Sequence, residues 1–163
     1  MLIILSIAII VCSYIYILLK PKTDFQILQS RLHNISDNIL YEKYPIFIND
    51  NIIDANDLVS TLFKYQYIFS KSFTLTQTHS MVNYSKYLII HNTDNNECTV
   101  KVSNPPRYTN NISVIIHPFN VLVIPYKWKI ETDECHSVQT KDRNLRCIQL
   151  NDFSHFLFNI HIN

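Results

Sequence analysis

Residues 117-HPFNVLVIPYKWKIE-131 are the stretch of this chain that indicates most about its fold. Pro118 favours a turn, and the β-branched and leucine run from 121 to 124 is typical of a strand. Pro125 interrupts that run, and because proline has no amide hydrogen to donate within a sheet, it separates two strands. The only tryptophan follows at position 128. We therefore expect a hairpin in the domain core, with Trp128 as its packing anchor.

The strand pattern continues on both sides of this stretch. Two apolar runs, 86-KYLIIHN-92 and 97-ECTVKVS-103, flank the turn residues 93-TDNN-96, which predicts a second hairpin. Further strands are expected at 44–50, after Phe69, and at 112–117, 137–140, 146–150 and 153–162. Roughly eight short strands separated by turn signals predict a mainly β chain, folded as a β-sandwich or a jelly-roll (cupin-like) domain.

The first nineteen residues, 1-MLIILSIAIIVCSYIYILL-19, contain no charged side chain. As a helix they would span roughly 28 Å, close to the ~30 Å hydrocarbon core of a bilayer. A cleaved signal peptide would begin with basic residues and end at a small-residue cleavage site, and this segment has neither feature. We expect residues 1–19 to form a transmembrane helix, with the lipid bilayer as partner.

Lys20 and Lys22 follow this segment, and no basic residue precedes it. The positive-inside tendency then predicts a single-pass membrane protein whose C-terminal domain is cytoplasmic. A glycosylated ectodomain of the opposite topology is the alternative, because Asn34, Asn83 and Asn111 each begin a glycosylation sequon.

Between the anchor and the strands, the apolar residues are spaced by three or four positions, as on one face of a helix. These residues are Phe25, Leu28, Leu32, Ile35 and Ile39. We expect a juxtamembrane amphipathic helix over 20–43, which either packs on the domain's own core or forms a homo-oligomer through 25–39 as a short coiled coil. Residues 44–163 would then be a mainly β globular domain with one helix near 55–65, capped at Asp54.

Glycine is absent from all 163 residues. Its absence excludes the P-loop, the dinucleotide-binding fingerprint and the GxSxG nucleophile elbow, since each needs glycine for close backbone approach or a strained turn. Left-handed backbone positions should therefore be filled by Asn or Asp. The formal net charge of +1 supplies no polyanion-binding face, so nucleic acid is not expected as a partner.

The chain contains seven histidines and four cysteines, which are candidate metal or catalytic groups. His91 and Asp94 are one position too far apart to share a strand face, so they do not form a facial-triad motif. The zinc candidates Cys98, Cys135, His136 and Cys147 lack the paired spacing of zinc ligands. No catalytic, cofactor-binding or metal residue is predicted. A convergence of His79, His91 and His117 on a carboxylate would reverse that expectation.

Residues 118-PFNVLVIPYKW-128 resemble the turn, apolar run, proline and tryptophan of the cupin and jumonji-like barrels. Those families place a glycine in the turn and an iron-ligating histidine shortly after the tryptophan, whereas this chain has Phe119 or Asn120 in the turn and 129-KIE-131 after Trp128. The resemblance implies a barrel without an iron site.

The glycine-free Ile/Asn/Tyr composition, the leading anchor, 44-YPIFIND-50 and 62-LFKYQYIF-69 resemble uncharacterised single-pass membrane proteins of large cytoplasmic DNA viruses, in particular the mimivirus-like giant viruses. Together with the missing site motifs, this predicts a non-enzymatic structural or protein-binding β-domain held at a membrane. The alternative is a cupin-like enzyme or small-ligand-binding domain. Exposed aromatic residues would indicate a binding face, and buried ones a core; the candidates are those of 65-YQYIF-69 together with Tyr84, Tyr87, Tyr108, Tyr126 and Trp128.

Overall fold

The computed structural model describes residues 2–63, 69–75, 79–132 and 145–152. The helices are α1 (Leu2–Leu19), a 3-10 turn η1 (Leu32–Asn34), α2 (Asp37–Tyr41) and α3 (Ala55–Leu62). The strands are β1 (Leu28–Ser30), β2 (Ile46–Ile48), β3 (Phe69–Leu75), β4 (His79–Val82), β5 (Tyr87–Asn92), β6 (Cys98–Ser103), β7 (Asn111–Ile116), β8 (Val121–Pro125), β9 (Lys129–Thr132) and β10 (Leu145–Asn151). The strands predicted at 137–140 and 153–162 lie outside the described residues.

The strands form two sheets, as a β-sandwich requires. One sheet has six strands in the order β1-β2-β8-β5-β10-β3, and the other has four in the order β4-β9-β6-β7. All neighbours are antiparallel except β1 and β2, which pair in parallel. The chain is thus mainly β, as its sequence predicts.

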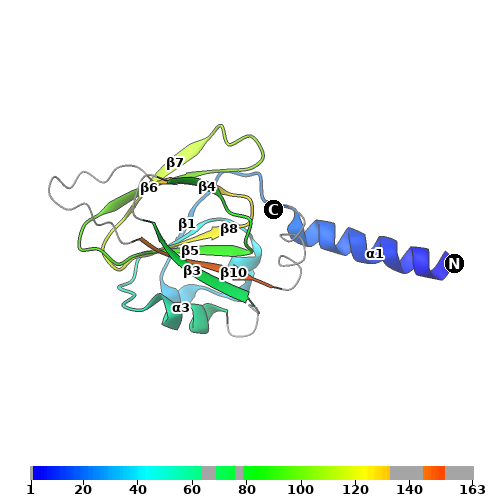
Figure 1. The fold of residues 1–163 in the computed structure, drawn as a ribbon, viewed down its shortest axis with the longest axis horizontal. Coiled ribbons are helices and arrows are strands. Elements are labelled where there is room, and N and C mark those ends of the chain that lie inside the picture. Colours follow the sequence, from blue (N-terminus) through cyan, green and yellow to red (C-terminus); the bar gives the residue numbers. More distant parts are fainter. Residues whose placement is uncertain (1, 64–68, 76–78, 133–144, 153–163) are drawn as a thin grey trace.

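The central strands β5 and β8 of the six-stranded sheet are buried on both faces, and the molecule has three layers (Figure 1). Leu88 and Ile90 of β5 lie in the core between the two sheets, whereas Tyr87 and Ile89 lie in a second core beneath α3. Because alternate residues of a strand point to opposite faces, every residue of β5 is buried. This double burial explains the continuous apolar runs of β5 and β8.

The stretch 117–131 connects the two sheets and is not the predicted hairpin. β8 lies in the six-stranded sheet and β9 in the four-stranded sheet. The second predicted hairpin is corrected in the same way, because β5 and β6 belong to different sheets. In both cases two strands with a short connection cross between layers, so each sheet contributes one buried face to the common core. Trp128 is fully buried in that core and stacks on Phe25 at 6.5 Å between ring centroids.

Asn83 holds the crossing from β8 to β9. Its side-chain Nδ2 donates to the carbonyl oxygens of Ile124 and Pro125 at 2.9 and 3.1 Å, and its Oδ1 accepts from the Ser85 amide at 2.9 Å. Its own amide donates to the Trp128 carbonyl at 2.9 Å. Asn83 is fully buried, so these bonds are shielded from water.

The predicted continuous helix over 20–43 does not form. Instead this segment contains β1, η1 and the five-residue α2. β1 pairs with β2, and the four regularly spaced side chains from Leu28 to Ile39 pack against the core beneath α3. Their spacing therefore reflects tertiary packing, which overrides local helix propensity. Because this helix does not form, residues 25–39 cannot pair as the predicted coiled coil. Self-association of the chain by another surface stays a prediction.

α3 coincides with the helix predicted near 55–65, and its N-cap is Asp54, as expected. β2 lies within the strand predicted at 44–50. α1 extends away from the sheets (Figure 1), and most of its side chains are exposed. Within the described residues, no helix combines the length and the apolar character needed to cross a membrane.

Left-handed backbone positions are not filled by Asn or Asp as predicted. The described residues with positive φ are Lys43, Tyr108, Phe119 and Lys127, with φ between 53° and 65°. The buried asparagines of the turns use their side chains as hydrogen-bond donors, as Asn120 does toward the Asp50 carbonyl at 3.2 Å. The left-handed position then falls on a neighbouring residue, Phe119 in this case.

Candidate functional site

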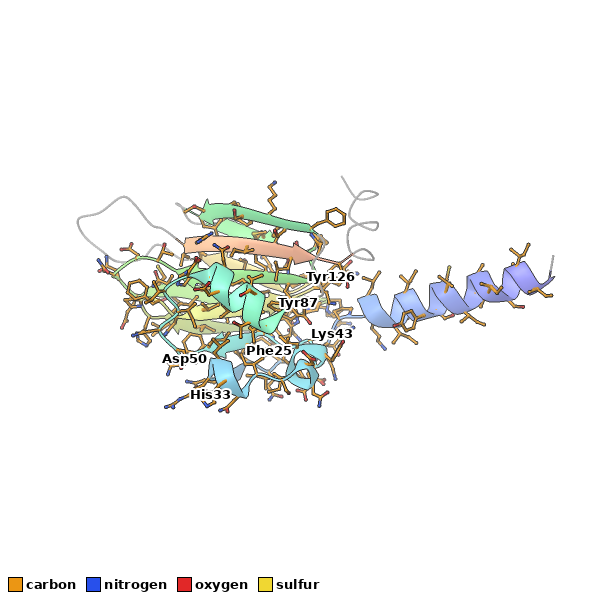
Figure 2. All side chains as sticks on the ribbon, turned by 90° about the horizontal axis from the view of Figure 1, so that it is seen from below. Phe25, His33, Lys43, Asp50, Tyr87 and Tyr126 are labelled. Atoms are coloured by element: carbon orange, nitrogen blue, oxygen red, sulfur yellow. The ribbon has the colours of Figure 1, made fainter. Side chains whose placement is uncertain are left out.

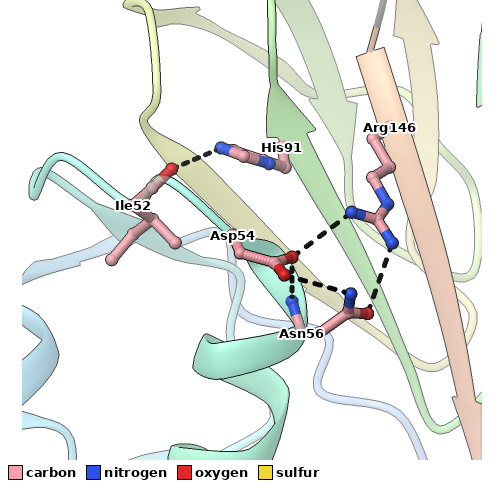
Figure 3. Close-up of polar contacts among 5 residues, drawn as sticks. All are labelled: Ile52, Asp54, Asn56, His91 and Arg146. Carbon is pink, nitrogen blue, oxygen red and sulfur yellow. Dashed lines mark hydrogen bonds and ion pairs between the residues drawn. The ribbon is translucent and has the colours of Figure 1, made fainter.

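A polar cluster lies where the N-terminus of α3 meets β10 (Figure 3). Asp54 Oδ1 accepts from the Asn56 amide at 2.9 Å, which caps the helix. Arg146 Nη1 contacts Asp54 Oδ1 at 3.3 Å, and its Nη2 donates to Asn56 Oδ1 at 3.3 Å. The hydrogen bond from Asn56 holds the pKa of the Asp54 carboxyl below its ordinary value, and Arg146 acts in the same direction. Asp54 is therefore ionised at neutral pH.

His91 lies on β5 directly across from Arg146 on β10, and it is fully buried. Its Nε2 lies 2.7 Å from the Ile52 carbonyl oxygen (Figure 3). Since a carbonyl only accepts, Nε2 carries the hydrogen. Burial lowers the pKa of His91 and the positive charge of Arg146 lowers it further, so the ring is neutral at pH 7. Its Nδ1 has no hydrogen-bond partner within the described part of the chain.

This cluster links elements and does not provide a reactive group. The ionised Asp54 is engaged by the helix N-terminus and Arg146, so it cannot serve as a general acid. The hydrogen on His91 is held by the Ile52 carbonyl. These bonds tie α3 and the segment before it to β5 and β10. We interpret the cluster as a structural connection between the helix layer and the sheet.

The histidines singled out from the sequence have separate partners. His117 Nδ1 contacts Glu97 Oε1 at 2.8 Å on the exposed surface, whereas His79 lies on β4 opposite Thr132. His91 is held as described above, and Asp94 begins a turn in which its amide donates to Asn92 Oδ1. Among the described residues, no group of three or more His, Cys, Asp or Glu side chains could hold a metal ion.

The two described cysteines of the domain lie in the core between the sheets. Cys98 and Cys147 are both buried, and burial raises the pKa of the Cys147 thiol to about 12. Because the thiolate is the nucleophile, Cys147 is unreactive at neutral pH. Cys135 and His136, the other zinc candidates, lie outside the described residues.

A cleft of about 820 Å³ lies between the C-terminal half of α1 and the adjoining loops of the domain. The helix contributes mainly apolar side chains, and the domain contributes the phenol rings of Tyr84, Tyr108 and Tyr126 together with Lys127. Burial raises the pKa of Tyr108 and of Tyr126, and the neighbouring Tyr84 acts in the same direction on both. The three phenol rings form one aromatic group beside the helix.

A second, smaller cavity of about 60 Å³ lies next to this cleft and is lined by Lys20, Lys43 and Lys86. Figure 2 shows Lys43, Tyr87 and Tyr126 at the end of the domain from which α1 leaves. Lys43 Nζ donates to the carbonyl oxygens of Ile17 and Lys20 at 3.3 and 2.9 Å, which satisfies two acceptors at the end of α1. Burial lowers the pKa of Lys43, and the positive charges of Lys22 and Lys86 lower it further.

These two cavities form one surface around the end of α1, which we call the basal surface. It consists of Lys20, Lys43, Lys86, Lys127, Tyr84, Tyr108 and Tyr126. Three of its residues, Lys43, Tyr108 and Lys127, have positive φ. A side chain with a Cβ is strained in this conformation, and strained backbone is concentrated at functional sites.

Of the basic residues in the basal surface, only Lys20 was indicated by a sequence pattern, because it directly follows the apolar segment 1–19. Lys43, Lys86 and Lys127 come from three distant segments and meet only through the fold. A sequence signal was nevertheless present, since each of these lysines is adjacent to a tyrosine. Two of the pairs stack in the structure, with Lys86 Nζ 5.9 Å from the Tyr87 ring centroid and Lys127 Nζ 5.4 Å from that of Tyr126.

Of the aromatic candidates from the sequence, Tyr87 and Trp128 are buried in the core, and Tyr84 is 44% exposed beside the cleft.

Comparison with known proteins gives no match, whether to a family model, to a curated protein or to a solved structure.

Proposed function

We propose that this chain is a membrane-anchored, non-enzymatic β-domain in which α1 holds a structural or protein-binding module at a bilayer. The observation that carries the proposal is the exposed surface of α1. Its large exposed side chains are apolar or aromatic and occupy successive positions, so they cover all sides of the helix; they are Ile3, Ile4, Leu5, Ile7, Ile9, Ile10, Val11, Tyr14, Tyr16 and Ile17. A helix that is apolar all round belongs in a hydrophobic environment, which water does not provide.

The length of α1 sets how it would fit a bilayer. Its 18 residues rise about 27 Å, slightly less than the ~30 Å of the hydrocarbon core. Local thinning of the bilayer accommodates a mismatch of this size at a modest free-energy cost. Tyr14 and Tyr16 would then lie toward the interface at the domain end, where aromatic side chains concentrate.

Alkaline extraction of membranes that contain the full chain tests the anchor. Wild type is expected to stay in the membrane pellet, whereas Ile9→Arg combined with Ile10→Arg is expected to be released, because charge near the centre of a span opposes insertion. The matched control, Ile53→Arg combined with Ile115→Arg, places the same charges on exposed isoleucines of the domain and should stay in the pellet. Release of the wild type would refute the anchor.

We further propose that the domain lies on the cytoplasmic side, as Lys20 and Lys22 favour. Asn111 begins an exposed sequon, whereas the Asn83 side chain is buried and hydrogen-bonded. A cytoplasmic domain should therefore show no glycosidase-sensitive mass at Asn111 when expressed in eukaryotic cells, and a glycan there would reverse the topology.

The finer fold we propose is a jelly roll formed by β3 to β10. The strand orders β3-β10-β5-β8 and β4-β9-β6-β7 support it, since consecutive strands alternate between the two sheets except at the β6–β7 hairpin. Jelly rolls occur in viral capsid proteins as well as in cupins. The compositional resemblance to giant-virus membrane proteins therefore favours a structural role in a virion or virus-factory membrane. One equivalent of iron or zinc in the purified full chain would contradict the non-enzymatic part of the proposal.

A further inference from the structure

The basal surface has the chemistry of a membrane–water boundary. Its four lysines converge from separate segments of the chain around the end of α1. Lysine ammonium groups are attracted to lipid phosphates, and tyrosine rings accumulate at the headgroup level because they have an apolar body and a polar tip. Both groups therefore occur here in the combination that a lipid surface favours.

The contacts of the linker after α1 hold this surface beside the helix. Asn104 Nδ2 donates to the Thr23 carbonyl at 2.5 Å, and Phe25 stacks on the buried Trp128. On the domain side, the Tyr108 hydroxyl donates to the Lys127 carbonyl at 3.0 Å, which joins the two loops that line the cleft. The lysines and tyrosines are thus positioned by the folded domain and not by an unattached tail.

The charge balance of the surface favours an anionic partner. Among the described residues that line the two cavities, Asp152 is the one acidic residue, and it is paired with Lys86 at 3.0 Å. Lys20 and Lys127 line the larger cleft, and the residues that the structure describes around this cleft include no acidic side chain. The cleft of about 820 Å³ is large enough for a phosphate-containing headgroup beside the helix.

We propose that the basal surface binds the headgroups of anionic phospholipids in the leaflet next to the domain. The inference rests on the proposed anchor, since α1 brings this surface to the bilayer. Anionic lipids are concentrated in the cytoplasmic leaflet, which agrees with the proposed topology. The phosphate would lie near Lys20 and Lys127, with the three tyrosine rings against the glycerol and upper acyl region.

Energy transfer from Trp128, the only tryptophan, to labelled lipid tests the proposal. The full chain is reconstituted into phosphatidylcholine vesicles that contain a small equal fraction of dansyl-phosphatidylserine or of dansyl-phosphatidylcholine. We expect stronger transfer to the serine lipid at 0.15 M salt and a smaller difference at 0.5 M salt, because salt screens the attraction. Each lysine close to an anionic lipid surface changes the partitioning of a protein to that surface by a factor of about five.

Lys20→Gln combined with Lys127→Gln should therefore lower the preference for the serine lipid at least fivefold. The matched control is Lys71→Gln combined with Lys101→Gln, which removes the same charge from β3 and β6 and should keep the preference. Equal transfer to both lipids in the wild type, or an equal loss in both double variants, overturns the inference.

Flotation of the same samples separates this inference from the anchor. A chain that floats with pure phosphatidylcholine vesicles but shows no lipid preference refutes headgroup binding and retains the anchor. A chain that floats only with vesicles containing phosphatidylserine, through Lys20 and Lys127, refutes the anchor and supports headgroup binding. Flotation with neither kind of vesicle overturns both.

Discussion

Replacing Asn83 with alanine should destabilise the domain strongly, because its side chain is fully buried and makes three hydrogen bonds. The substitution leaves the backbone bond from Asn83 to Trp128 in place but deletes three side-chain bonds, to Ile124, Pro125 and Ser85. All three involve buried positions, so water cannot replace the lost partner without opening the junction between the sheets.

The magnitude follows from these bonds. Each neutral hydrogen bond contributes a net ~1 kcal/mol, and a buried group left without a partner costs ~1–3 kcal/mol. We expect Asn83→Ala to lower the free energy of unfolding by about 2–4 kcal/mol, which corresponds to a fall in Tm of roughly 6–12 °C for a chain of this size. Asn83→Asp should be at least as damaging, because the carboxylate has no donor for the two carbonyls.

The measurement is denaturant unfolding of the full chain in a fixed detergent, followed by Trp128 fluorescence. Asn111→Ala is the matched control, because Asn111 is exposed and begins the sequence Asn-Ile-Ser, which is similar to the Asn-Tyr-Ser that begins at Asn83. It should change the free energy of unfolding by no more than about 0.5 kcal/mol. A loss below about 1 kcal/mol for Asn83→Ala, with unchanged denaturant dependence, would show that the side chain does not hold the crossing between β8 and β9.

Three further predictions concern single side chains. Burial raises the pKa of Cys147 to about 12, so its thiol should react with iodoacetamide only at the rate of global unfolding, and rapid labelling of the native chain at pH 7 would contradict this burial. The pKa of His91 is lowered in the folded state, so the unfolded state binds more protons below about pH 6.5, and stability should fall as the pH drops from 7 to 5. The substitution His91→Gln should flatten this dependence of stability on pH. An unchanged slope in the variant would exclude His91 as its source. Lys127→Gly should raise the free energy of unfolding by about 0.5–1 kcal/mol, because it relieves the strain of the left-handed backbone at φ 65°. Lys101→Gly within β6 should instead lower the free energy of unfolding, and thermal unfolding distinguishes the two variants.

The strands could be predicted from sequence because their local signals agree with their environment. β5 contains the run 88–90 and β8 the run 121–124, and burial on both faces is what such continuous apolar runs indicate. The helix α3 could also be predicted from the sequence, because Asp54 supplies an N-cap directly before the apolar face of the helix. The helix predicted at 20–43 was wrong because apolar residues spaced by three or four positions also occur in an irregular segment that packs on a sheet.

The strand pairing could not be predicted in the same way. A short connection between two strands favours a hairpin on local grounds, yet the connections after β5 and β8 cross between sheets. The deciding contacts are distant in sequence, as with Asn83, whose side chain bonds to the carbonyls of Ile124 and Pro125. No local pattern reports such a bond.

Three properties follow from the amino-acid sequence alone: the chain is mainly β, it contains an uncharged apolar segment before the domain, and it has no glycine-dependent phosphate motif. These properties depend on composition and on spacing within one segment. The assignment of strands to sheets requires the folded chain, and so does the grouping of Lys20, Lys43, Lys86 and Lys127 around the end of α1. Burial and charge proximity depend on the distance between segments in space, and local propensity does not specify that distance.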